Sequence, residues 1–208
     1  MEWIAFILVG VNVGLTASVM VRFEDLLVEA KRKLAMGFID KNIALAWLTY
    51  SGVSIVCVIV AVLMTVDWGK GSKGSGISEL MAYMNGVNYP NTFGFEVYTT
   101  KVFGTLLAVV GGLCVGKEGP MAHIGANIGI AVLYLPLPKF EFFRNDVSKR
   151  HLIAAGTSAG VSAAFGSPIG GALFAYEISK PNTFWKFSVI WKVYCSCAVA
   201  VLVLALLH

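Results

Sequence analysis

The sequence predicts an all-α, polytopic membrane protein, and three observations support this prediction. Apolar residues make up 57% of the 208 residues and charged residues only 13%, against roughly 25% charged residues in soluble domains. The apolar residues form long blocks, and a bilayer core needs around 20 of them for each spanning helix. Short segments bounded by Gly or Pro lie between the blocks. The membrane interior tolerates such broken helices only where protein or water satisfies the hydrogen-bonding groups of the backbone.

Three apolar blocks are long enough to cross a bilayer alone. They cover residues 3–21, 43–66 and 187–207. We expect a first helix over about 2–36 with an amphipathic far end, a second over 43–66, and a last span near 184–207.

The middle of the chain predicts further helical segments over about 96–115 and from Pro120 to 135, with an aqueous loop over 136–151. Three pieces, over 79–86, 152–165 and 168–178, are too short to span a bilayer alone. Such segments, interrupted by Gly or Pro, indicate a substrate pathway near the membrane midplane. The alternative is re-entrant packing with no transport role.

Small residues are concentrated in and after the predicted segment over 152–165. In lipid, small residues let helix backbones approach closely, so this composition predicts tight helix packing. The residues are Gly156, Ser158, Gly160, Ser162, Ala164, Gly166, Gly170 and Gly171.

GGLCVGKEGP, residues 111–120, nearly matches a phosphate-binding loop, because it reads G-x-x-x-x-G-K from Gly111. That loop needs Ser or Thr after the lysine to hold magnesium, and here the residue is Glu118. The carboxylate would repel phosphate, so the motif does not indicate nucleotide binding. The net charge of +4 is small, and we expect no nucleic-acid partner.

GTSAG, residues 156–160, matches the G-x-S-x-G pattern of hydrolases. The pattern has meaning only on a strand-to-helix turn where a His and an acid converge on the serine. Here it lies in an Ala/Gly-rich helical stretch, so we expect the protein not to be an enzyme. An intramembrane hydrolase that uses Ser158 is the remote alternative.

Two other stretches have the composition of an anion site at a helix start, where free N–H groups favour negative charge. In GSGIS, residues 74–78, glycines allow close approach and Ser75 adds a hydroxyl donor. In GKEGP, residues 116–120, Pro120 suits a first helical turn and Glu118 falls at the positive end of the next helix. A carboxylate there would compete with a mobile anion; the alternative is that Glu118 only caps its helix.

GSGIS, GKEGP and the stretch AAGTSAGVSAAFGSPIGGALFAYE, residues 154–177, resemble in order three motifs of the CLC family of chloride channels and chloride/proton exchangers. The detail around GKEGP is most similar to the intracellular branch of endosomes, lysosomes and vacuoles. The resemblance implies that residues 1–208 form the first half of an inverted-repeat membrane domain, without the second half or cytoplasmic nucleotide-sensing domains. It also implies a homodimer.

By the same resemblance, Glu118 is the gating glutamate, and no cofactor or metal is needed. Chloride, the transported ion, would be bound by Ser75 and by backbone N–H groups of Gly76, Ile77 and Gly119. The residues that complete the two motifs are Gly74, Gly116, Lys117 and Pro120.

The sequence departs from the family pattern at two positions. Ser78 stands where the family usually has proline, and Ile178 stands where exchangers commonly have a second acid that relays protons. Since isoleucine cannot carry a proton, we expect channel-like chloride transport. A chloride/proton exchanger and a non-conducting fragment or scaffold remain alternatives. The expected location is an endomembrane, with the plasma membrane as the alternative.

Overall fold

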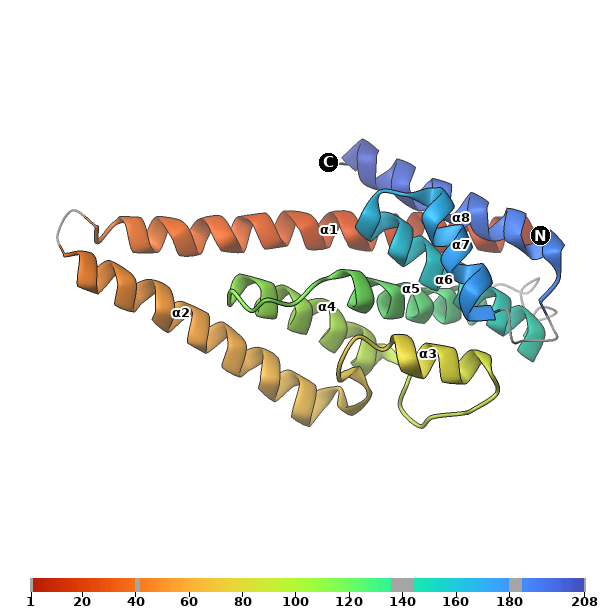
Figure 1. Cartoon of the computed structure of the whole chain (residues 1–208), viewed down its shortest axis with the longest axis horizontal. Coiled ribbons are helices and arrows are strands. Elements are labelled where there is room, and N and C mark those ends of the chain that lie inside the picture. Colours follow the sequence, from red (N-terminus) through yellow and green to blue (C-terminus); the bar gives the residue numbers. More distant parts are fainter. Residues whose placement is uncertain (1, 40–41, 136–143, 180–184, 208) are drawn as a thin grey trace.

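The computed structural model describes residues 2–39, 42–135, 144–179 and 185–207, and every regular element in these ranges is helical (Figure 1). The predicted all-α fold is confirmed. A π-helical turn, η1 (Met64–Trp68), and a 3-10 turn, η2 (Lys70–Ser72), lie between the second and third α-helices. The α-helices are α1 (Glu2–Met36), α2 (Ile43–Leu63), α3 (Ile77–Met84), α4 (Phe95–Val110), α5 (Glu118–Leu133), α6 (Asp146–Phe165), α7 (Pro168–Ser179) and α8 (Phe187–Leu207).

The three long apolar blocks form helices with the length and composition needed to cross a membrane, as predicted. Within the described residues these helices are Glu2–Met36, Ile43–Trp68 and Phe187–Leu207. The second comprises α2 and its continuation through η1. The last span was expected near 184–207. Residues 185 and 186 are not helical, and α8 begins at Phe187.

The prediction of a short segment over 152–165 was wrong. Helix α6 begins at Asp146 and has 20 residues, because the Ser148 amide donates to the Asn145 side-chain oxygen at 2.7 Å and this cap starts the helix in a polar stretch. Residues 146–151 are therefore helical rather than loop, and residues 136–143 lie outside the described part. Smaller shifts affect α3, which starts two residues before position 79, and α4, which ends at Val110 rather than 115.

Helices α5 and α6 are antiparallel and touch through their backbones. A Cβ added at Gly125 would lie 2.7 Å from the Gly156 carbonyl carbon, and one added at Gly156 would lie equally close to that of Gly125. One turn away, a Cβ at Gly160 would lie 2.8 Å from the Met121 carbonyl carbon. The small residues of α6 thus pack closely as predicted, and this packing fixes where α5 lies.

Helices α1 and α8 lie side by side and run in the same direction (Figure 1). A Cβ at Gly10 would lie 2.5 Å from the Ser196 oxygen, and one at Gly14 would lie 2.7 Å from the Ala200 oxygen. The four-residue step on both helices shows the parallel register, and the small-x-x-x-small spacing is typical of close contacts in lipid. The Gly10–Gly14 pair was not recognised in the sequence.

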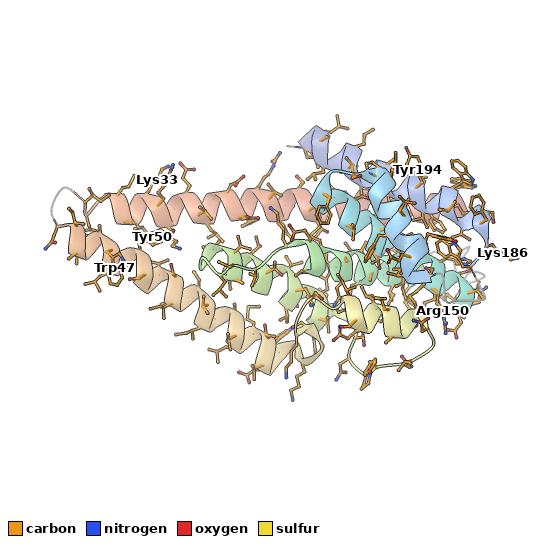
Figure 2. The ribbon with its side chains drawn as sticks, viewed as in Figure 1. Lys33, Trp47, Tyr50, Arg150, Lys186 and Tyr194 are labelled. Atoms are coloured by element: carbon orange, nitrogen blue, oxygen red, sulfur yellow. The ribbon has the colours of Figure 1, made fainter. Side chains whose placement is uncertain are left out.

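Helix α2 diverges from the body of the protein and leaves most of its side chains exposed (Figure 1). Figure 2 shows Tyr50 between α2 and α1, whereas Trp47, which is 69% exposed, points outward. The buried Lys31 amine lies 4.0 Å from the centre of the Tyr50 ring and donates to the Val110 oxygen at 2.8 Å. One cation thus connects α1, α2 and the last residue of α4.

Replacing Gly156 with alanine should destabilise the protein by about 1–3 kcal/mol, because the new methyl group overpacks a backbone contact. The matched control is Gly52→Ala on exposed α2, where an added Cβ meets nothing within 4 Å, so its stability should be unchanged or higher. Thermal unfolding of the purified variants measures both effects. Equal melting temperatures for the two variants would contradict the proposed backbone contact.

Candidate functional site

Two helix starts, at α3 and α5, converge on Ser75 and Gly119. A Cβ added at Gly119 would lie 2.7 Å from the Ser75 Cβ and 3.7 Å from Ile77 Cδ1. Gly119 is therefore in contact with Ser75 and close to Ile77, two other residues predicted to bind an anion, although it lies more than 40 positions from both in the sequence. Only glycine at position 119 allows this approach.

A cavity of about 370 Å³ opens at the same place. Gly74 and Ser75 line it from the start of α3, and Gly116 and Pro120 line it from the start of α5. Thr100 and Lys101 of α4 add polar side chains to the wall of this cavity. Both predicted motifs therefore contribute to a single cavity.

The backbone at each helix start leaves amides without a partner inside the helix. The first intrahelical bonds are donated by Leu80 to Gly76 in α3 and by Met121 to Lys117 in α5. The amides of Ile77 and Gly119 precede these bonds, as the first amides of any helix do. The Ile77 amide has only a 3.4 Å contact with the Ser75 hydroxyl oxygen.

Glycines give the GSGIS stretch its shape. Gly74 and Gly76 have positive φ angles of 65° and 81°, which residues with a Cβ rarely adopt. Gly76 is the cap residue immediately before α3. Ser78, which stands where the family pattern usually has proline, lies in the first turn of α3, so the helix forms without a proline at this position.

Glu118 is the first residue of α5, as predicted, and its side chain turns back over Gly116. A Cβ added at Gly116 would meet a Glu118 carboxylate oxygen and lie 3.2 Å from the carboxylate carbon. The neighbouring Lys117 amine instead forms a 3.0 Å ion pair with Glu24 of α1. The two charged side chains of the GKEGP motif therefore lie in different places, Lys117 against α1 and Glu118 over Gly116.

Lys101 is a cation in the cavity wall that the sequence reading missed. It is only 3% exposed, and its amine donates to the Gly74 oxygen at 2.7 Å. An ammonium group has three donors, so it keeps others for a ligand. The signal in the sequence was a lysine directly before the largely apolar run of residues 102–110, since an ionisable residue at membrane depth by default indicates function.

Gly76, Ile77, Glu118 and Gly119 adjoin residues of the cavity lining without belonging to it. Two other candidate residues belong to different parts of the fold. Ile178 is buried on α7 and is not part of the cavity lining. Ser158 is buried in α6, and its hydroxyl donates to the Ala154 oxygen of the same helix at 2.7 Å. Within the described ranges no three His, Cys, Asp or Glu side chains are grouped as metal ligands.

Comparisons with known proteins support the identity of these motifs. The family model for voltage-gated chloride channels matches residues 57–208. The chloride channel protein CLC-a of Arabidopsis thaliana is 35% identical over 98% of this chain, and the human H⁺/Cl⁻ exchange transporter 7 is 34% identical over 96%. The chain spans only 27% and 26% of the lengths of these two relatives.

Solved structures share the fold. The crystal structure of a slow cyanobacterial Cl⁻/H⁺ antiporter matches all of this chain and 47% of its own, with a TM-score of 0.89 and 23% identity. A eukaryotic CLC transporter matches 98% of this chain and 38% of its own, with a TM-score of 0.79 and 23% identity. The family match over residues 57–208, together with this fold, shows that the chain belongs to the voltage-gated chloride channel (CLC) family.

Proposed function

We propose that this chain forms one wall of a CLC-type chloride pathway, with the anion held between the starts of α3 and α5. The observation that carries the proposal is the contact of Gly119 with Ser75 at the edge of a cavity that both motifs line. Chloride is the transported ion, and the proposal requires neither a cofactor nor catalysis.

Electrostatics favour an anion in this cavity. Each helix start contributes roughly half a positive charge, and the amides of Ile77 and Gly119 have no partner within their helices. The Lys101 ammonium adds a full charge in the same wall. Glu24 pairs with Lys117, and among the described residues no carboxylate lies within ion-pair distance of the Lys101 amine.

Glu118 is suited to gate this pathway. Its carboxylate is tethered at the positive start of α5, where it competes with chloride for the same potential. Protonation removes its charge and thus its advantage over the mobile anion. The alternative role as a helix cap has less support, because Lys117 is the cap residue and has no side-chain capping bond, while Glu118 folds over Gly116.

Channel-like transport is the mode that we propose, because Ile178 offers no group that could relay a proton. The names of the human exchange transporter and the cyanobacterial antiporter make proton-coupled exchange the second candidate. Recording chloride and pH simultaneously separates the two. Chloride flux without stoichiometric proton movement supports the channel, and coupled proton movement supports the exchanger.

The chain spans about a quarter of its curated relatives, so we propose that it acts as part of a CLC membrane domain in a homodimer. Large apolar side chains at Ile169 and Leu173 of α7 and Trp191 of α8 are more than half exposed, as a protein or lipid contact requires. From the family resemblance we propose an endomembrane location. A non-conducting scaffold is the alternative, and the absence of chloride flux from folded, reconstituted chain would support it.

An intramembrane hydrolase has no support from the arrangement around Ser158, whose hydroxyl is committed to its own helix. The Ser158→Ala variant tests this alternative. A hydrolase would lose turnover in that variant, whereas the transport proposal expects a packing effect alone.

Replacing Glu118 with glutamine should raise chloride flux at neutral pH and remove the pH dependence of that flux, because glutamine mimics the protonated acid. Chloride efflux from liposomes that contain the full chain, compared at low and neutral pH, measures both properties. A variant whose flux keeps the wild-type pH dependence would refute the gating role.

Replacing Gly116 with alanine should displace the Glu118 carboxylate, because the new methyl group occupies its position. The flux at neutral pH should then rise toward that of the Glu118→Gln variant. The matched control is Gly104→Ala in the same cavity wall, where the nearest atom to an added Cβ is 3.8 Å away. Indistinguishable fluxes from the Gly116 and Gly104 variants would contradict this position of the carboxylate.

A further inference from the structure

His123 of α5 is fully buried, and its ring orientation is fixed by hydrogen bonding. The Nε2 atom lies 2.7 Å from the Thr92 oxygen. A carbonyl can only accept, so Nε2 carries the hydrogen. Nδ1 has no hydrogen-bond partner within the described residues, and in the neutral ring it therefore presents a lone pair.

That unpartnered edge of the ring faces Gly76, the cap residue of α3. A Cβ added at Gly76 would meet Nδ1 and would lie 2.7 Å from the His123 Cγ. The imidazole thus occupies the space that a side chain at position 76 would take. Because the ring fills this space, it limits how far the start of α3 can move toward α5.

The ring itself has little freedom. Phe93 contacts it edge-on, with ring centres 5.9 Å apart, and Phe93 in turn contacts Tyr83 of α3 at 5.0 Å. One turn along α5, the Asn127 side chain donates to the His123 oxygen at 3.0 Å and accepts from the Gly94 amide at 2.9 Å. His123 and Asn127 therefore hold the segment before α4 against α5, and this segment holds the ring.

Two residues before Gly76, the Gly74 oxygen accepts a hydrogen bond from the Lys101 amine at 2.7 Å. The turn before α3 is thus held by both α4 and α5. Its amides can be held in a set position only if both contacts persist, and a site needs its groups held to within about 0.5 Å.

We propose that His123 is a positioning residue for the anion site. By contacting Gly76, it sets the separation between the amides at the start of α3 and those at the start of α5. This separation determines chloride affinity and the preference for chloride over larger anions. The inference rests on the proposed function, because it assumes that an anion binds between the two helix starts.

The test is calorimetric titration of the purified full chain with chloride and with nitrate, in a buffer free of both. His123→Leu, which removes the bond to Thr92, should weaken chloride binding by about tenfold and reduce the chloride-to-nitrate preference. His123→Gln keeps an N–H donor for the Thr92 oxygen, so its affinity should stay within about threefold of wild type.

The matched control is Ile124→Ala, which truncates the next residue of α5, also fully buried. It should lower the melting temperature by removing core contacts and leave both anion affinities unchanged. If the leucine variant does not fold, His123→Asn, whose shorter side chain cannot reach the Thr92 oxygen, tests the same contact and should also weaken chloride binding.

Each outcome bears on a different claim. Wild-type affinity and selectivity in His123→Leu, or in His123→Asn where it is used instead, would overturn the positioning role alone. Equal losses in His123→Leu and Ile124→Ala would also overturn it, because general destabilisation would then explain both. A folded wild-type chain that binds no chloride would overturn the proposed function itself.

Discussion

The approach of Gly119 to Ser75 is the constraint on which the rest of the structure depends. Two helix starts repel each other electrostatically, since each carries partial positive charge, and here they meet at a cavity of about 370 Å³ with Lys101 in its wall. The Gly74 oxygen accepts one hydrogen bond from the Lys101 amine, and an anion or the Glu118 carboxylate would stabilise the remaining positive charge. In the proposed pathway, chloride and the Glu118 carboxylate therefore compete for the same positive charge.

Close backbone packing of the surrounding helices holds the starts of α3 and α5 in place. Backbone contact at Gly125 and Gly156 fixes α5 against α6, and contacts at Gly10 and Gly14 fix α1 against α8. In lipid, such packing replaces the hydrophobic effect as the source of helix association. A helix as short as α3 depends on its neighbours for its position, and the contact of His123 in α5 with Gly76 is one of the contacts that hold it.

The sequence was sufficient to predict those parts of the site that depend on local chemistry. The glycines of GSGIS indicated a close backbone approach at a helix start, and Pro120 placed Glu118 at the start of the next helix. Both can be read from adjacent residues. The roles of Lys101 and His123 could not be read in this way, because each acts on a turn that the fold brings to it from elsewhere in the chain. The start of α6 was missed for another reason: hydropathy follows burial, and a polar first turn with an Asn145 cap is helical without being apolar.

The central claim is that an anion lies between the starts of α3 and α5, and anomalous scattering from bromide in crystals of the chain tests it most directly. The account predicts a bromide peak in the cavity, within hydrogen-bonding range of the Ser75 hydroxyl and the amides of Ile77 and Gly119. Bromide bound at other places, with this cavity empty in the same crystals, would contradict the account.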